Sequence, residues 1–273
     1  MRAFRFGVQG AAALTEPTWS EFVRRAEDFG YDVVSLADHF DGRPAPTVAL
    51  AYAAAVTDRI RLGTAVLGVD FRNPVLLAQE VATLDELSRG RVELGLGAGW
   101  KREDYDVTGI PFDPPGVRIE RLAAAVPELR AALRPDLPVM LGGGGPRMLT
   151  LAARLADIVS IVPPNPGGRS DPWGPDGTRA AFAEKAAFVR EAAGARAGRI
   201  ELHTRVFADA EGPAADALGS DEAAASPMVL VRPVSAMVDK LLRLRDELGL
   251  SYFTVSAPFL DEFAPVIEAL SGR

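Results

Sequence analysis

The sequence predicts an α/β fold, a single (β/α)8 TIM barrel over residues 1–273 with loop insertions on the C-terminal face of the barrel. The chain is long enough, and at 48% hydrophobic residues apolar enough, to bury a large core. Short apolar runs alternate with helix-like segments from end to end, which makes about eight strand–helix pairs. Eight parallel strands with helices outside close into a barrel of about 250 residues, whereas an open, doubly wound sheet matches the pattern less well.

The predicted strands are short apolar runs. In chain order they cover residues 4–8, 32–36, 61–66, 91–96, 138–141, 157–162, 200–207 and 252–256. The run DVVSL at 32–36 is typical of a parallel strand that is buried on both faces.

The predicted helices lie between and after these strands. In chain order they cover residues 18–29, 48–56, 75–88, 117–133, 146–155, 178–193, 235–248 and 261–270. Thr18 is a typical N-cap for the first helix and Gly30 a typical end, Gly90 ends the third helix, and Pro146 fits the first turn of the fifth. The third helix is predicted to carry one apolar stripe made of Leu76, Leu77, Val81, Leu84 and Leu87.

Two segments interrupt the alternation of strands and helices. Residues 163–177 are too rich in Pro and Gly for a helix or a strand, and residues 208–233 combine acidic and alanine-rich stretches with three prolines. Both are predicted to be loops, the second with one short helix at most. Because each follows a predicted strand, we expect both on the C-terminal face, either as part of the substrate site or as variable surface loops.

The composition excludes several classes of function. The chain has no cysteine, which excludes disulfides and thiol catalysis, and its two histidines cannot build a multi-histidine metal site. The net charge of −7 does not favour binding to nucleic acid or to an anionic membrane. No apolar segment approaches the roughly 20 residues of a membrane-spanning helix, and no signal-peptide pattern precedes the first strand. We therefore expect a cytoplasmic protein with a small-molecule substrate.

Asp38 and His39 directly follow the predicted strand 32–36, at the mouth of the barrel. Histidine is suited to proton transfer near neutral pH, or to a hydrogen bond with a reactive ring. Asp38 is a candidate to orient His39 or to bind cofactor hydroxyls. A single histidine is more often structural, but its place at a strand end makes His39 the preferred catalytic candidate.

Two glycine clusters follow other strands. The first is GLGAGW, residues 95–100, where glycines allow backbone amides to approach a ligand closely; its spacing is not that of a dinucleotide-binding motif. The second consists of Gly142, Gly143, Gly144 and Gly145 at the start of a predicted helix. Free amides and the positive end of a helix dipole favour an anion there, so this turn is the expected site of a cofactor phosphate.

Several of these segments resemble one family in chain order. The sequence GYDVVSLADH, residues 30–39, resembles the glycine–aromatic–Asp strand ending in Asp-His of the luciferase-like monooxygenase superfamily. The stretch at 61–100 and the LAARLADIVS stretch after the glycine turn resemble its core. The resemblance runs from Phe4 to about Val162. Members of this superfamily bind a flavin or the deazaflavin coenzyme F420.

The resemblance implies a set of cofactor-binding residues. A bulge with a non-proline cis peptide, here Ala65–Val66, is expected behind the cofactor ring, and Ala98, Gly99 and Trp100 beside the ring and its side chain. His39 is expected to contact the ring or to act as acid or base. The glycine turn is expected to contact the phosphate or tail of the cofactor. The pair Asp104-Tyr105 is interpreted as structural.

His203 and Arg205 alternate with Leu202, Thr204 and Val206 on the predicted strand 200–207, and either set is compatible with the barrel interior. Arg205 is a candidate anchor for an anionic group, although a solvated or salt-bridged arginine is the commoner case. Neither residue is included in the predicted catalytic set.

The resemblance implies a flavin- or deazaflavin-dependent oxidoreductase, and the sequence favours coenzyme F420 and hydride transfer over FMN. The alternatives are an FMN-dependent monooxygenase that uses reduced flavin and oxygen, and a flavin-binding protein without turnover. A barrel aldolase or isomerase is disfavoured, because the three lysines lie in predicted helices or loops. The resemblance also suggests a homodimer.

Overall fold

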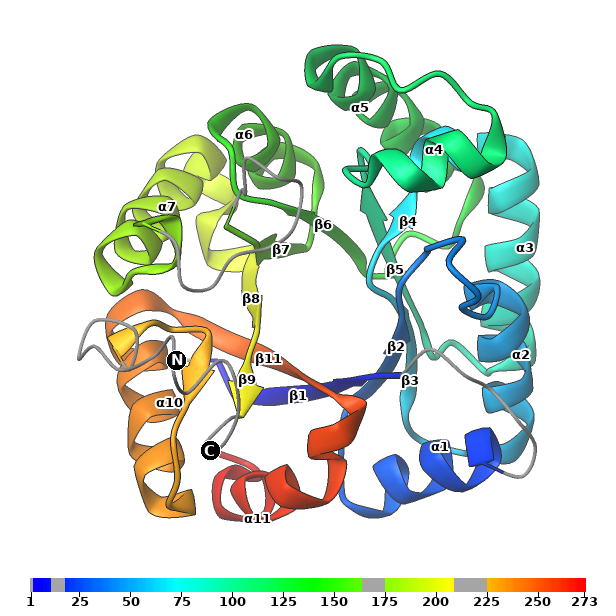
Figure 1. The fold of residues 1–273 in the computed structure, drawn as a ribbon. Coiled ribbons are helices and arrows are strands. Elements are labelled where there is room, and N and C mark those ends of the chain that lie inside the picture. Colours follow the sequence, from blue (N-terminus) through cyan, green and yellow to red (C-terminus); the bar gives the residue numbers. More distant parts are fainter. Residues whose placement is uncertain (1, 11–17, 164–174, 209–224) are drawn as a thin grey trace.

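The computed structural model describes residues 2–10, 18–163, 175–208 and 225–273. Within them the main sheet is parallel and closes on itself, in the order β3-β2-β1-β11-β8-β7-β6-β5-β4, with β3 also paired to β5. In Figure 1 the strands surround the centre of the molecule and the helices lie outside them. The protein is a TIM barrel, and the predicted fold class is confirmed.

The barrel strands are all short and mostly buried. In chain order they are β1 (Arg5–Gln9), β2 (Val33–Leu36), β3 (Arg61–Thr64), β4 (Leu67–Gly68), β5 (Val92–Gly97), β6 (Val139–Gly143), β7 (Ile158–Ile161), β8 (Glu201–Arg205) and β11 (Leu250–Ser256). Since β3 and β4 both pair with β5, they occupy one position of the barrel. The break between them falls at residues 65 and 66, where the resemblance implied a bulge and the apolar pattern alone predicted a strand through 66.

The helices that cover the barrel follow the strands in turn. They are α1 (Thr18–Asp28), α2 (Pro46–Val56), α3 (Pro74–Leu87), α5 (Pro115–Ala132), α6 (Pro146–Leu155), α7 (Arg179–Ala193), α10 (Val234–Leu248) and α11 (Leu260–Leu270). The predicted helix ends agree with these bounds within two residues. The agreement follows from local signals, such as Asn73 capping α3 and Thr178 capping α7.

Two features were not predicted. Helix α4 (Arg102–Thr108) is short and begins at Lys101 without a side-chain cap, so the sequence carried no start signal for it. Strands β9 (Phe207–Ala208) and β10 (Val229–Leu230) form a separate parallel pair, although 207 was predicted as barrel strand and 229–230 as loop. Strands of two residues that pair across a long stretch of chain leave no recognisable pattern in the local sequence. The rest of the two predicted loops, 164–174 and 209–224, lies outside the described residues.

The apolar stripe predicted for α3 is partly wrong. Leu77, Val81 and Leu84 are buried, whereas Leu76 and Leu87 are 60% and 69% exposed. Residues one position apart on a helix differ by about 100° in direction. Positions 77, 81 and 84 share one face, while 76 and 87 lie on the neighbouring face, which points to solvent.

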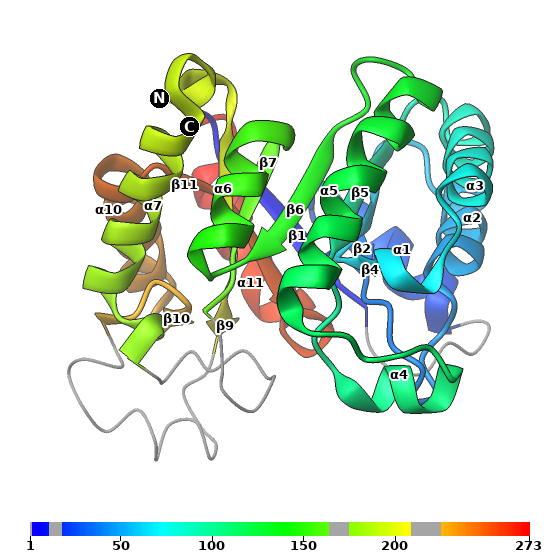
Figure 2. The same cartoon turned by 90° about the horizontal axis from the view of Figure 1, so that it is seen from above.

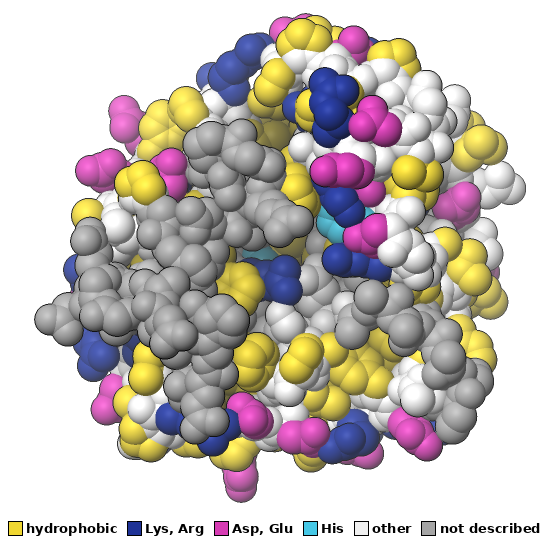
Figure 3. Space-filling view, viewed as in Figure 1, with side chains coloured by type: hydrophobic (Ala, Val, Ile, Leu, Met, Phe, Trp, Pro, Cys, Tyr) yellow, Lys and Arg dark blue, Asp and Glu magenta, His cyan; other side chains and the backbone are white. Residues whose placement is uncertain are grey.

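One end of the barrel carries the C-terminal ends of the strands. Figure 2 shows α4, β9 and β10 at this end and the C-terminus of the chain at the other. The same end, seen in Figure 3, is hollowed near its centre, where side chains of both histidines are visible. Within the described ranges, no helix has both the length and the apolar character needed to cross a membrane.

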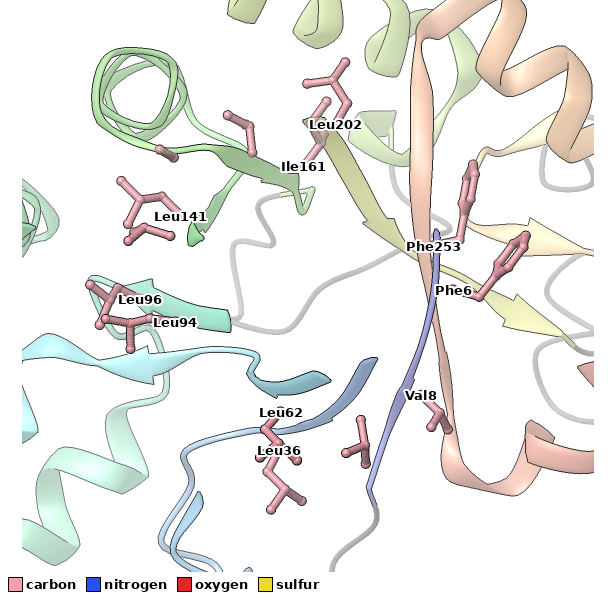
Figure 4. Packing of buried hydrophobic residues seen from close by; sticks show 14 of the residues in the cluster. Phe6, Val8, Leu36, Leu62, Leu94, Leu96, Leu141, Ile161, Leu202 and Phe253 are labelled. Carbon is pink, nitrogen blue, oxygen red and sulfur yellow. The ribbon is translucent and has the colours of Figure 1, made fainter. Parts of the chain in front are cut away.

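The apolar core has two parts, because neighbouring residues of a strand point to opposite faces. Figure 4 shows the larger part, made of outward-facing strand residues that pack against the helices, among them Leu94, Leu141 and Phe253. Inside the barrel lies a smaller cluster of Val33, Met140, Ile158 and Tyr252, with Val66 packed against it.

Below this inner cluster the barrel is closed by charged residues, which we call the Arg5 cluster. Arg5 donates to Glu93 at 2.5 Å and to Glu201 at 2.6 Å, and its guanidinium lies 4.4 Å from the ring centre of Tyr252. Burial raises the pKa of Glu201, which makes its pairing with Arg5 necessary for a charged carboxylate at this place.

Candidate active site

A cavity of about 410 Å³ opens at the C-terminal ends of the strands. Its size falls in the range of about 300–1,000 Å³ that is typical of small-molecule sites. It is lined by predicted site residues and by residues that the sequence did not single out. The predicted ones are Asp38, His39, Ala65, Val66, Ala98, Gly99, Trp100, Gly142, Gly143 and Gly144. Gly145, also predicted, does not line the cavity and is the N-cap of α6.

His39 lies at the cavity wall beside two other residues. Its Nδ1 is 2.7 Å from Asp104 Oδ2, and its ring meets the Trp100 ring edge-on at a centre distance of 5.5 Å. Asp104 is buried, and its other oxygen accepts the backbone N–H of Phe40 at 3.1 Å. Since an ionised carboxylate only accepts hydrogen bonds, Nδ1 carries the proton and Nε2 is the ring nitrogen left for a ligand.

Asp38 does not orient His39. Both of its oxygens bind Arg72, and Oδ2 also accepts the backbone N–H of Gly68 at 3.0 Å. This buried ion pair ties the end of β2 to the segment after β4. The orienting role that the sequence offered to Asp38 belongs to Asp104, which had been interpreted as structural.

The Ala65–Val66 peptide is cis, as the resemblance implied. Gln9 Nε2 donates to Ala65 O at 3.0 Å, which connects this segment to β1. The Val66 side chain packs on the inner core cluster and forms an apolar wall of the cavity. A Cβ on Gly97 would lie 2.7 Å from Val66 Cγ2, so the glycine makes room for this segment.

The loop after β5 is held by an arginine that also lines the cavity. Arg118 on α5 is buried and donates to the carbonyl oxygens of Ala98, Gly99 and Asp113. Gly99 has φ +71°, and a Cβ there would collide with the Tyr105 hydroxyl. Gly97 and Gly99 therefore make room for side chains of the protein itself. The sequence had suggested only that glycines here let a ligand approach the backbone. No local signal marked Arg118.

The glycine turn after β6 leads directly into α6, and no side chain caps this helix. Gly142, Gly143 and Gly144 line the cavity next to Ser160. The positive end of the α6 dipole thus lies next to the glycine turn that lines the cavity.

His203 and Arg205 face the cavity, while Leu202 and Val206 pack in the outer core, which settles the alternation left open by the sequence. His203 bonds to Ser160 Oγ at 2.8 Å and Thr254 Oγ1 at 2.9 Å. Burial, with a smaller contribution from the charge of Arg5, lowers the pKa of His203 to about 3. His203 is therefore neutral near pH 7 with both nitrogens occupied, a supporting role that leaves His39 as the histidine available to a ligand.

Comparisons with known proteins agree with this geometry. A family model described as luciferase-like monooxygenase matches residues 5–208. The chain is 29% identical over 181 residues to the 5,10-methylenetetrahydromethanopterin reductase of Archaeoglobus fulgidus, covering 59% of this chain and 54% of that protein. It is 35% identical over 169 residues to the F420-dependent glucose-6-phosphate dehydrogenase of Kribbella flavida, covering 50% of each. The matches thus span about half the length of these relatives.

The fold is also similar to that of a solved F420-dependent secondary alcohol dehydrogenase in complex with an F420-acetone adduct. The TM-score is 0.78 at 18% identity, with 98% of this chain and 99% of the other covered. At this identity the similarity concerns the fold alone.

Proposed function

The chain belongs to the luciferase-like monooxygenase family, and from this premise we propose that it is an oxidoreductase that uses coenzyme F420 to transfer a hydride to or from a small organic substrate. The names of its relatives favour F420 over FMN. The observation that carries the proposal is the cavity itself, where an apolar wall at Val66 and the Asp104–His39 pair border one space.

The residues of the cavity fit such a cofactor. Ala65, Val66, Gly97 and residues 142–144 form one continuous side of it, which we call the β3–β6 wall. Its small and apolar side chains suit a flat ring, and the uncapped start of α6 suits a phosphate. When bound, F420 supplies a hydride acceptor or donor, while the protein supplies position and exclusion of competing reactions.

In this proposal His39 moves the proton that accompanies hydride transfer. With Nδ1–H directed at Asp104, the Nε2 lone pair accepts a proton from a substrate hydroxyl during oxidation and returns it during reduction. Asp104 accepts the Nδ1–H bond and so stabilises the protonated ring. Trp100, 46% exposed, covers His39 from the solvent side.

The proposal is tested by equilibrium binding of F420 and of FMN to the purified protein, followed by fluorescence quenching. We expect tight F420 binding that Gly144→Arg abolishes, because a long cationic side chain fills the cavity edge, and that His39→Ala leaves unchanged. Gly198→Arg is the matched control, since nothing lies within 4 Å of its Cβ and Gly198 is not part of this cavity.

A preference for FMN would instead favour a monooxygenase that uses reduced flavin and oxygen. Binding of neither cofactor would overturn the proposal. Tight binding of F420 without any turnover on a broad panel of alcohols and aldehydes would favour a binding protein.

We further propose a homodimer in the cytoplasm, with residues 1–273 acting as one domain. Neighbouring helices α2 and α3 expose Val48, Val75 and Leu76, which are 70%, 67% and 60% exposed and supply an apolar face for a second copy. Sedimentation velocity measures the oligomeric state, cell fractionation the location, and limited proteolysis the domain organisation.

A further inference from the structure

Arg205 is a charged group of the cavity to which the proposed reaction assigns no role. Its Nη2 donates to Ser256 Oγ at 2.6 Å, and its guanidinium lies 5.1 Å from the ring centre of Phe207. Its Nε is fully buried and has no hydrogen-bond partner in the described part of the chain. Among the residues that the structure describes, no carboxylate forms an ion pair with it.

The other charged groups that line the cavity have partners within the protein. Asp38 is paired with Arg72 and Asp104 with His39, and Arg118 is bonded to three backbone carbonyls. Arg205 differs from them, because its buried Nε has no partner among the described residues and its Nη2 donates to a neutral hydroxyl.

The charged neighbour that acts on Arg205 is Arg43, which has the same sign. Burial lowers the pKa of Arg205, and the neighbouring charge of Arg43 lowers it further. Arginine nevertheless stays protonated in proteins, so the charge persists. A cation removed from water without a counter-ion is unfavourable, and an anion that enters the cavity removes this penalty.

The position of Arg205 separates it from the β3–β6 wall. It ends β8, and its partner Ser256 ends the adjacent strand β11. Strand β7 lies between β8 and β6, and on the other side β11, β1 and β2 lie between β8 and β3. Figure 1 shows β8 and β5 on opposite sides of the barrel. A molecule held by Arg205 thus faces the β3 and β5 part of the wall across the cavity, with β7 between Arg205 and the β6 part.

We propose that Arg205, supported by Ser256, binds an oxyanion group of the substrate, a carboxylate or a phosphate monoester. Nε–H and the adjacent Nη–H form a planar fork that matches two oxygens of such a group. The enzyme then acts on an anionic small molecule and holds its charged end opposite the cofactor. This inference rests on the proposed function of the cavity.

The test is calorimetric titration of the intact protein with inorganic phosphate and, in a separate arm, with acetate, at constant ionic strength. We expect one saturable site for at least one of the two anions. Arg205→Gln should weaken it about tenfold or more, because charge-assisted hydrogen bonds are lost, while Arg205→Lys keeps part of the affinity. The two arms distinguish a phosphate site from a carboxylate site.

Arg196→Gln is the matched control. Arg196 also bonds to neutral oxygens, the carbonyls of Ala153 and Ala156, but it is not part of the cavity, so the anion affinity should not change. If Arg205→Gln does not fold, Ser256→Ala provides a second variant that should weaken binding in the same direction.

F420 affinity is measured on the same samples, so that the two proposals can fail separately. Unchanged F420 affinity in Arg205→Gln together with weakened anion binding supports the inference. An equal loss of both affinities would assign Arg205 to the cofactor and overturn it, as would the absence of saturable anion binding. Anion binding that depends on Arg205 in a protein that binds no F420 would support the anion site and overturn the F420 function.

Discussion

At the scale of single residues, the direction of a side chain decides its role more than its neighbour in the sequence does. Asp38 is adjacent to His39 in the chain, but both of its oxygens bind Arg72. Asp104, which lies 65 positions after His39 in the chain, is the residue that bonds to His39. Consecutive residues at a strand end point in different directions, so a chain neighbour is seldom the hydrogen-bond partner.

We predict that Asp104→Asn lowers kcat by about 10- to 10⁴-fold. The amide of asparagine can donate to Nδ1, which favours the tautomer with the proton on Nε2 and removes the acceptor. KM, F420 affinity and the free energy of unfolding should change little. Steady-state assays on an accepted alcohol and urea unfolding measure these quantities.

Asp106→Asn is the control on the same helix, because its side chain is 63% exposed and its partner Arg102 lies 3.8 Å away. A fall in stability that matches the fall in kcat would contradict a positioning role for Asp104.

At the scale of elements, one side chain of helix α1 fixes the backbone segment that leads into strand β3. Glu27, near the end of α1, accepts the backbone N–H groups of Asp58, Arg59 and Ile60 at 3.1, 2.6 and 2.7 Å. These amides directly precede β3. Burial raises the pKa of Glu27, but the three hydrogen bonds outweigh it and the net shift is downward.

We predict that Glu27→Gln lowers the free energy of unfolding by about 1 kcal/mol at pH 7, a value at the low end because the carboxylate is partly exposed. Since the folded pKa lies below the unfolded one, this stabilisation is present above the unfolded value and is lost as the pH falls through the folded value. Urea unfolding from pH 7 to pH 3 should show the difference shrinking. Glu21→Gln, exposed on the same helix, should show no such trend.

At the scale of the whole molecule, the Arg5 cluster joins strands that are distant in the sequence. Arg5 on β1 is bonded to Glu93 on β5 and Glu201 on β8. These contacts cross the interior of the barrel, so they exist only when the sheet has closed. The Arg5 cluster therefore stabilises only the closed barrel and not the separate strands.

We predict that Arg5→Leu lowers the free energy of unfolding by about 3–5 kcal/mol, because it removes the nearest counter-charge of two buried carboxylates and leaves Glu93 with Arg61 at 3.9 Å. Arg25→Leu is the comparison, since the Arg25–Asp261 pair also joins distant elements but is 54% and 56% exposed. An exposed pair contributes about 0–1 kcal/mol. If urea unfolding gave the same loss of unfolding free energy for both variants, burial of the Arg5 cluster would make no difference to its contribution to stability.

The order of elements and the barrel class could be predicted because their signals are local. Helix caps, glycine ends and apolar runs act within a few residues, and the observed bounds follow them closely. The strand ends that carry His39, Val66 and Gly143 could be predicted for the same reason, since ligands of such barrels bind at the C-terminal ends of strands.

The partners in the site depended on the tertiary structure. Asp104 reaches His39 from a short helix, Arg205 turns inward on β8, and Arg118 holds the loop after β5 from α5. Each of these contacts joins residues that only the closed barrel brings together. Sequence by itself determined which segments become strands and helices, because those choices are made by neighbours in the chain. Closure of the barrel decided which side chains meet and which charge is left for a ligand, because electrostatic and packing energies depend on distances in space.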